Sequence, residues 1–342
     1  MRIFCTSGPV DKKTCYYIER PDIMEEALDH IENWRYFNII SPEESGKTTF
    51  LKTLIENLRN KYLTIYISLN GYGKIGYDEF KKKFINDFRK SLKEMGADEL
   101  KIKNLKRINN IILEIAEKEN KEIILMVDDF EKLKTLEVLN EFLHTIRAMF
   151  HMKKEYKLRS VIFSGAKYIP IMPDDKGSPY NIAEHMEIPY FTKEQVYDLL
   201  SQHETETGQI FDEKVKELIW HNAAGQPGLT NGLAYDLVMK KAKGEKIITE
   251  KHFEKTLYDY MYVYIDKNIA NIINKAKNEK DLIMKILFEP NNVEFNIYDE
   301  NIKFLYLNGL IDNCNGKCCV RVPLYYKALY ARFKPKVNID NS

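Results

Sequence analysis

A glycine, a lysine and a threonine follow one another at Gly46, Lys47 and Thr48, shortly after the apolar run YFNII at Tyr36–Ile40. Backbone N–H groups around such a glycine can face phosphate oxygens, the lysine can neutralise their charge, and the hydroxyl can hold Mg²⁺. The next stretch, Lys47–Asn60, has the apolar spacing of a helix, whose N-terminal dipole favours an anion. These residues predict a loop that binds a nucleoside triphosphate and Mg²⁺, with Thr48 as a metal ligand and with nucleotide contacts from Glu44, Ser45, Gly46, Lys47, Thr48 and Thr49.

The pattern departs from a complete phosphate-binding motif at one position. Ser41 stands where GxxxxGK[ST] has its first glycine. A bare GKT also occurs at an ordinary helix start that exposes its lysine, and this reading is the alternative. The setting of strand, loop and helix favours phosphate binding, because the motif requires that setting.

A second apolar run ends in two acidic residues. The segment IILMVDD, Ile123–Asp129, carries two carboxylates at the end of an apolar strand. At the carboxyl edge of a sheet, Asp128 would ligate the metal and Asp129 would orient an attacking water, with Glu131 as the fallback. The alternative is a buried strand that ends in an exposed turn. Asp129 is shorter than the glutamate common at this position, so we expect slow hydrolysis or none.

The first two thirds of the chain alternates strands and helices. Strands are predicted at Tyr36–Ile40, Leu63–Ser68, Ile123–Val127 and Ser160–Phe163, with a fifth at Met186–Ile188. Helices are predicted between them, at Lys47–Asn60, Tyr77–Glu94, Leu105–Lys118 and Thr135–Phe150. This order predicts the α/β class, a doubly wound parallel sheet of the P-loop NTPase type.

After Phe191 the pattern becomes helical. Helices are predicted at Thr192–Glu206, where Thr192 and Gln195 have capping-box spacing, and at Asp212–Asn222, Pro227–Lys243 and Glu250–Asp266. Helices near Glu279–Phe288 and Tyr298–Asn308 precede a hairpin at Asn315-Gly316, which is the outline of a winged helix. We expect three domains: the P-loop α/β domain at 1–190, with 1–30 as an opening segment at the nucleotide site, a helical lid at 191–249 and a winged helix at 250–342.

The composition of the chain bears on its partners and on its location in the cell. The 342 residues carry 52 basic and 51 acidic side chains, a net charge of +1, which provides no chain-wide attraction for nucleic acid or anionic lipid. No apolar run is long enough to span a membrane, and the N-terminus lacks the apolar core of a signal peptide, so we expect a cytoplasmic protein. The five cysteines are too few for a disulfide framework, and we expect reduced thiols.

Together these motifs resemble the AAA-like ATPase domains of the STAND class of P-loop NTPases, from about Phe4 to Phe333. The opening SGPVDKKTCYYIERPDIMEEAL is similar to the segment that lies by the nucleotide base in that family, which implies adenine or phosphate contacts by Tyr17, Ile18 and Arg20. The run SPYNIAEHMEI at Ser178–Ile188 resembles the approach to the family's last strand. Ser164 falls where a polar group senses the γ-phosphate.

The segment WHNAAGQPGLTNGLAYDL at Trp220–Leu237 resembles the family's GxP motif, with Gly225 and Pro227 on the motif positions. A helix start at Pro227 can also face a phosphate on physical grounds, and a plain helix junction is the alternative. No clear arginine finger is present; Arg147 and Arg159 are candidates only by their place in the sequence. The C-terminal GLIDNCNGKCCVRVPLYYKAL resembles the winged helix that follows such lids.

The resemblance implies an ATP-binding or ADP-binding, slowly hydrolysing ATPase that acts as a regulatory switch, with Lys47, Asp128 and Asp129 as catalytic residues and Asp128 as a second metal ligand. An unidentified protein partner and oligomerisation on nucleotide binding are expected. One alternative is a DNA-associated ATPase of the transposition or replication-initiation type; the acidic residues Asp299 and Glu300 on the would-be recognition helix argue against it. Another is a nucleotide-bound scaffold without hydrolysis.

Overall fold

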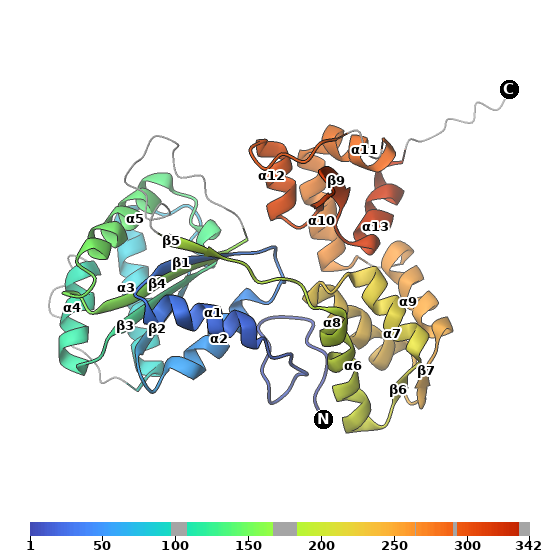
Figure 1. Cartoon of the computed structure of the whole chain (residues 1–342), viewed down its shortest axis with the longest axis horizontal. Coiled ribbons are helices and arrows are strands. Elements are labelled where there is room, and N and C mark those ends of the chain that lie inside the picture. Colours follow the sequence, from blue (N-terminus) through green and yellow to red (C-terminus); the bar gives the residue numbers. More distant parts are fainter. Residues whose placement is uncertain (97–107, 167–182, 264, 290–292, 335–342) are drawn as a thin grey trace. The chain divides into compact units, whose positions relative to one another are not determined.

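The computed structural model describes residues 1–96, 108–166, 183–263, 265–289 and 293–334. The chain forms two compact units, which we describe separately. The first comprises Met1–Glu19, Pro42–Gly46 and Pro189–Ser342, and the second comprises Arg20–Ser41 and Lys47–Ile188. Most elements of both are labelled in Figure 1.

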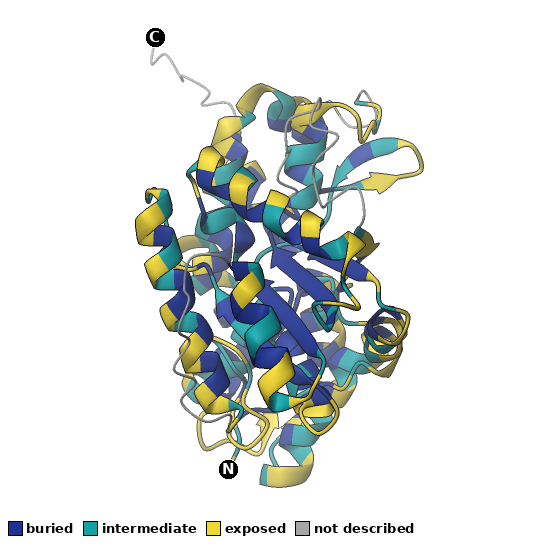
Figure 2. Ribbon diagram, turned by 90° about the vertical axis from the view of Figure 1, so that its left-hand side faces the viewer, coloured by how far each residue is buried: buried dark blue, intermediate teal, exposed yellow. Residues whose placement is uncertain are grey.

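A parallel sheet of five strands lies at the centre of the second unit. Its order is β2-β3-β4-β1-β5, and every neighbouring pair is parallel. The strands are β1 (Tyr36–Ile40), β2 (Leu63–Ser68), β3 (Ile123–Asp128), β4 (Leu158–Gly165) and β5 (Ala183–Met186). All residues of β1 and β3 are buried, as expected for strands covered on both faces. Figure 2 shows these strands in dark blue. The predicted α/β class with a parallel P-loop sheet is confirmed.

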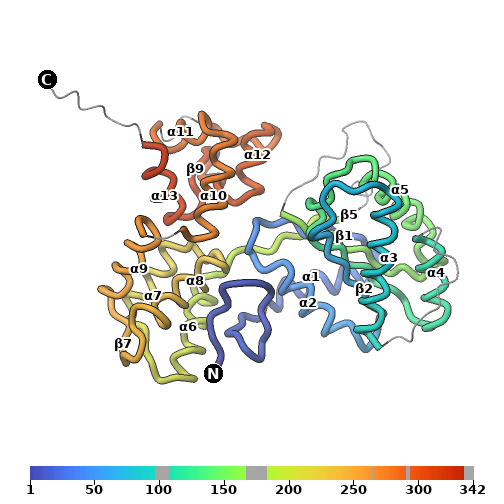
Figure 3. The backbone as a smooth tube through the Cα atoms, turned by 180° about the vertical axis from the view of Figure 1, so that it is seen from behind, coloured from blue at the N-terminus to red at the C-terminus, as the bar shows by residue number. Residues whose placement is uncertain are grey.

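Helices cover both faces of this sheet. On one face, α1 (Pro21–Glu32) and α2 (Lys47–Leu58) pack on Phe37, Ile39 and Met126. On the other face, α3 (Tyr77–Glu94), α4 (Ile108–Glu119) and α5 (Leu136–His151) pack on Ile65 and Leu125. Figures 1 and 3 show these layers from opposite sides. Because the strands are parallel, the carboxyl ends of β1 to β4 meet at one edge.

Helices dominate the first unit. Its first group is α6 (Lys193–Thr207), α7 (Glu213–Ala223), α8 (Pro227–Asp236), the π-helical turn η3 (Leu237–Lys241) and α9 (Glu250–Tyr262), with the short parallel pair β6 (Ile210–Phe211) and β7 (Ile247–Ile248). The predicted capping box is present, since Thr192 accepts a hydrogen bond from the Gln195 amide and the Gln195 side chain accepts one from the Thr192 amide. Phe4, Tyr16 and Ile18 of the N-terminal segment pack into this helical group.

A second helical group and a hairpin complete this unit. They are α10 (Lys267–Asn278), α11 (Lys280–Phe288), α12 (Glu300–Leu307), β8 (Ile311–Cys314), β9 (Lys317–Val320) and α13 (Pro323–Phe333). The hairpin turns at Asn315 and Gly316, whose φ values of 54° and 84° are those of a type I′ turn, as predicted.

Three predictions in these regions do not hold. The edge strand β5 ends at Met186, because its pairing with β1 runs from Ala183 to Met186. The predicted helix Glu250–Asp266 is wrong at its end: α9 stops at Tyr262, and Asp266 caps a new helix, α10, by accepting hydrogen bonds from the amides of Asn268 and Ile269. Cys314 and Cys319 form a disulfide across the hairpin, where strand pairing brings their Cα atoms to 5.9 Å, so the expected reduced thiols are wrong for this pair.

None of the helices in the described ranges is both long enough and apolar enough to cross a membrane.

Candidate nucleotide-binding site

The loop after β1 has the backbone shape that its sequence demands. Glu44 and Gly46 both have positive φ, at 59° and 97°, and α2 begins at Lys47. Ser41 does not have positive φ, so no glycine is needed where the motif usually has one. Its amide donates to the Gly165 carbonyl at 3.3 Å, and its hydroxyl accepts from the Ile188 amide at 2.9 Å. Ser41 therefore joins the base of the loop to the last residue of β4 and to the segment that follows β5.

Lys47, Thr48 and Asp128 come together where this loop meets the sheet edge. The Lys47 ammonium donates to the Ser41 carbonyl at 2.7 Å, which folds the lysine over its own loop. The Thr48 hydroxyl donates to Asp128 Oδ2, also at 2.7 Å. Asp128 is 1% exposed and ends β3. A hydroxyl and a carboxylate in contact beside a lysine form the donor set that a magnesium-bound triphosphate requires. Thr49 follows in the first turn of α2.

Two residues of β2 support the acids, and the sequence analysis missed both. Tyr66 donates from its hydroxyl to Asp128 Oδ2 at 2.9 Å, and Ser68 donates to Asp129 Oδ2 at 2.7 Å. Burial beside Asp128 raises the pKa of the Tyr66 hydroxyl well above its ordinary value, so it remains a donor. The sequence does contain a signal for them: β2 is parallel to β3, so polar residues near its carboxyl end lie at the same edge of the sheet as Asp128 and Asp129.

Asp129 lies in the left-handed region, with φ of 55°, and its amide donates to Asp128 Oδ1 at 3.0 Å. Burial raises the pKa of its carboxyl, the hydrogen bond from Ser68 opposes that rise, and the carboxylates of Asp128 and Glu131 add to it. Glu131 is engaged elsewhere, since its Oε2 accepts from the Ala166 amide at 3.2 Å. Both carboxylates thus accept a hydrogen bond, and the choice of Asp129 over Glu131 as the water-orienting residue stays a prediction.

Replacing Asp129 by asparagine is expected to stabilise the fold while it slows any hydrolysis. A carboxyl whose folded pKa is raised favours the folded state when protonated, and this contribution is lost as pH rises through that pKa. At pH 7 the neutral amide removes repulsion with Asp128, and we expect a melting temperature higher by about 2 °C. Differential scanning fluorimetry should show this gain at pH 7 and its progressive loss as the pH falls below the ordinary pKa of aspartate, where the carboxyl is protonated in the folded and the unfolded chain. A lower melting temperature at pH 7 would contradict the assignment.

The other predicted nucleotide contacts divide between the two units. In the second unit, Arg20 is the N-cap residue of α1, and Ser164 lies near the carboxyl end of β4. In the first unit, Ile18 is buried among the helices, and the Tyr17 backbone exchanges hydrogen bonds with the Gln202 side chain of α6. The structure thus gives Ile18 a packing role.

Gly225 and Pro227 flank the start of α8 in the first unit. Gly225 has φ of 72°, and a Cβ there would lie 2.0 Å from the Phe191 carbonyl oxygen. That oxygen belongs to a segment whose Phe191 amide donates to the Gly225 carbonyl at 2.8 Å. Pro227 occupies the first turn of α8, and Gln226 caps it by accepting from the Leu229 amide. The turn therefore requires glycine for close approach, and the helix start has the predicted form.

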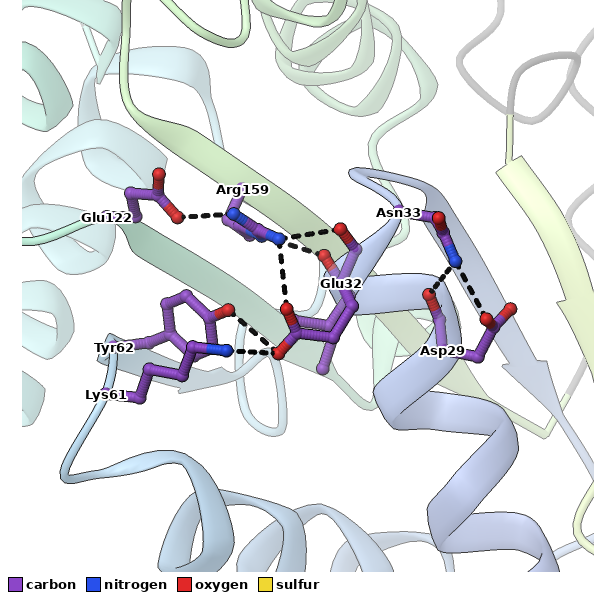
Figure 4. Close-up of polar contacts among 8 residues, drawn as sticks. Asp29, Glu32, Asn33, Lys61, Tyr62, Glu122 and Arg159 are labelled. Atoms are coloured by element: carbon purple, nitrogen blue, oxygen red, sulfur yellow. Dashed lines mark hydrogen bonds and ion pairs between the residues drawn. The ribbon is translucent and has the colours of Figure 1, made fainter.

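Arg159 is not available as an arginine finger. Its guanidinium donates to the carbonyls of Ile31 and Glu32 and to the carboxylates of Glu32 and Glu122, at 2.6 to 3.2 Å. Figure 4 shows this network, in which Lys61 and Tyr62 also contact Glu32. Arg159 lies near the start of β4, whereas the phosphate loop follows the end of β1. Its role is to join α1 to the sheet. Arg147 lies in α5.

Unpartnered buried hydroxyls provide a test of whether this site fits a ligand. Among the described residues, the buried hydroxyls of Ser45 and Ser164 have no hydrogen-bond partner, and both occupy predicted nucleotide positions. Such groups carry a cost unless a ligand or water satisfies them. With the Thr48 and Asp128 pair, they fit a phosphate ligand and Mg²⁺. A bound Mg²⁺ would neutralise phosphate charge, and Tyr66 would keep Asp128 oriented while Thr48 turns to the metal.

Comparison with known proteins places these features in a family. Residues 5–331 match the AAA-like domain family. The chain belongs to this family. No curated protein is found to match it.

Solved structures share the fold of this AAA-like chain. The Walker-type ATPase Paby2304 of Pyrococcus abyssi matches with a TM-score of 0.69 at 14% identity, over 95% of this chain and 99% of that one. The RuvB Holliday junction branch migration motor of Thermotoga maritima gives 0.52 at 11% identity, over 94% and 96%. Cdc6p of Pyrobaculum aerophilum gives 0.50 at 15% identity, over 92% and 93%. At these identities the likeness establishes the P-loop ATPase fold alone.

The family match also covers the segment SPYNIAEHMEI, of which the structure describes only a part. Within SPYNIAEHMEI, residues 178–182 lie outside the described residues, and only the part in β5 and after it is seen.

Proposed function

We propose that this AAA-like chain binds ATP with Mg²⁺, hydrolyses it slowly, and acts as a nucleotide-dependent switch of the STAND type. The observation that carries the proposal is the contact of the Thr48 hydroxyl with the Asp128 carboxylate, at 2.7 Å, beside Lys47 at the edge of the parallel sheet. In the proposal, Thr48 and Asp128 hold Mg²⁺, Lys47 binds the β- and γ-phosphates, and Asp129 orients water.

The division of the phosphate loop supports the switch. Pro42–Gly46 belongs to the first unit, while Ser41 and the residues from Lys47 onward belong to the second. In the proposal, a nucleotide that binds along this loop contacts residues that belong to each unit. The proposal assigns residues 191–249 to a helical lid that contributes Gly225 and Pro227 as nucleotide contacts, and residues 250–342 to a winged helix. The winged helix would present a surface to a protein partner in one nucleotide state.

Energy transfer between fluorophores tests the switch. Dyes attached at the exposed positions Glu56 of α2 and Lys251 of α9 report on the two units. We expect the transfer efficiency with a non-hydrolysable ATP analogue to differ from that with ADP. Equal efficiencies with both nucleotides, under conditions where both are bound, would refute the switch and leave nucleotide binding intact. Phosphate release measured on the same protein separates a slow ATPase from a silent scaffold.

One observation favours a second candidate, a DNA-associated ATPase. Four exposed tyrosines line a groove between α9 and α13, and we call this feature the tyrosine groove: Tyr258, Tyr262, Tyr326 and Tyr330. The Tyr326 and Tyr330 rings are stacked with centroids 6.0 Å apart, and Lys327 and Lys334 line the same groove. Aromatic platforms with flanking cations are typical of single-strand binding.

Fluorescence anisotropy with a labelled oligothymidine tests this candidate. If the tyrosine groove binds a single strand, we expect the double variant Y258A/Y330A to weaken binding by at least about 30-fold, since base stacking contributes roughly 1–3 kcal/mol for each base. The matched control is Y298A, which removes a tyrosine exposed elsewhere in the same unit. No binding by the unaltered chain, or an equal loss in Y298A, would exclude the groove as a DNA site.

A further inference from the structure

Two adjacent glutamates, Glu43 and Glu44, lie in the phosphate loop itself. A triphosphate carries several negative charges, and the Debye length at physiological salt is about 8 Å, so nearby carboxylates repel it. Two carboxylates without counter-charges would therefore weaken the binding of phosphate to this loop. The fold must therefore compensate this charge if the loop is to work as proposed.

One face of α10 provides that compensation. Lys267, Asn271 and Lys275 follow one another at intervals of four residues and so share one side of the helix. The Lys267 ammonium lies 2.8 Å from Glu44 Oε1, and the Lys275 ammonium lies 3.3 Å from Glu43 Oε2. The Asn271 amide donates to the same Glu43 oxygen. The Lys275 side chain is 12% exposed and the Glu43 side chain 37% exposed, so solvent screens this ion pair in part.

The start of α8 holds the backbone of the same loop. The Gly228 amide donates to the Glu44 carbonyl at 3.3 Å. A Cβ on Gly228 would lie 2.3 Å from Glu44 Oε2, so the approach needs a glycine. The Gln226 side-chain amide lies 3.5 Å from the carbonyls of Glu43 and Glu44. The loop tip is thus fixed by α8 at its backbone and by α10 at its carboxylates.

We propose that α10 supplies the counter-charges that allow this loop to bind nucleotide, so that nucleotide affinity depends on whether α10 is docked on the loop. The proposal rests on the proposed nucleotide binding and adds its regulation. Lys267 and Lys275 act through the glutamates, as positioning residues. Because binding couplings are reciprocal, nucleotide also stabilises the docked α10, and a partner that pulls α10 away lowers nucleotide affinity.

Titration with a fluorescent ATP analogue and Mg²⁺ tests the proposal with four variants. K267Q/K275Q leaves the two carboxylates uncompensated, and we expect its Kd to rise on the order of tenfold. E43Q/E44Q removes the two charges but keeps the loop backbone, through which Glu44 would contact phosphate, so it should bind at least as tightly as the unaltered chain. The quadruple variant should return to within about threefold of the unaltered chain. K277Q is the matched control, because Lys277 contacts Asn274 of its own helix, and its Kd should not change.

Each outcome of this titration decides the proposal. An unchanged Kd in K267Q/K275Q would overturn it. A quadruple variant as weak as K267Q/K275Q would also overturn it, since the lysines would then be binding phosphate directly. If K267Q/K275Q does not fold, the single variant K267Q replaces it, because that lysine is half exposed, and a rise of about threefold is expected. Failure of the unaltered chain to bind would instead refute the proposed function.

Discussion

Replacing Lys47 by alanine is expected to weaken binding of Mg²⁺ and ATP by at least about 100-fold, because charge-assisted hydrogen bonds to phosphate are lost. Lys47 stands at the first position of α2, and its ammonium reaches back to the Ser41 carbonyl. It is therefore in place to bind an anion held by the loop. Isothermal titration calorimetry of both proteins measures the change directly.

The matched control for this prediction is K52A, which removes an exposed lysine from the same helix. Its ATP affinity should equal that of the unaltered chain. The melting temperature of K47A without nucleotide should stay within a few degrees, so that the loss reflects binding and not unfolding. Equal ATP affinity in K47A and the unaltered chain would contradict the assignment of this lysine.

Replacing Asp128 by asparagine is expected to abolish the dependence of ATP binding on Mg²⁺ and to lower phosphate release by about 100-fold or more. The carboxylate is buried, and three donors converge on it: the hydroxyls of Thr48 and Tyr66 and the Asp129 amide. Asparagine keeps the shape and an acceptor oxygen for these donors but removes the charge that holds a divalent cation.

The measurement compares ATP affinity in millimolar Mg²⁺ with affinity in EDTA, for D128N and for D129N. D129N serves as the control, since Asp129 is assigned to water and should leave the effect of Mg²⁺ on binding intact. The same gain from Mg²⁺ in D128N as in the unaltered chain would show that Asp128 is not a metal ligand. If Mg²⁺ no longer increases ATP affinity in D129N but still does so in D128N, then Asp129 is the metal ligand and Asp128 is not.

The sheet and its loop could be predicted because local signals agreed with the tertiary fold. The runs YFNII and LTIYIS consist mostly of apolar, branched or aromatic residues, and the strands β1 and β2 match them residue for residue. Short local motifs determine the backbone geometry at two further places, the capping box that begins at Thr192 and the turn at Asn315-Gly316. Such features need no knowledge of distant contacts.

The missed features depend on contacts between distant parts of the chain. Tyr66 and Ser68 read as ordinary strand residues until β2 is placed beside β3. The helix α10 was missed although Ile269, Ile272 and Ala276 have helical spacing, because the preceding helix was extended to its N-cap, Asp266. Without this helix, nothing in the sequence places Lys267 and Lys275 on one side or predicts their ion pairs with Glu44 and Glu43. Arg159 illustrates the opposite error, since only the structure shows that its donors are engaged.

A crystal structure of the chain with Mg²⁺ and a non-hydrolysable ATP analogue tests the central claim most directly. We predict that the triphosphate lies against the backbone amides of Gly46, Lys47 and Thr48, with the metal beside Thr48 and Asp128 and with the Lys47 ammonium turned from the Ser41 carbonyl to the phosphates. Nucleotide bound elsewhere, or no nucleotide at this loop at millimolar concentration, would contradict the account.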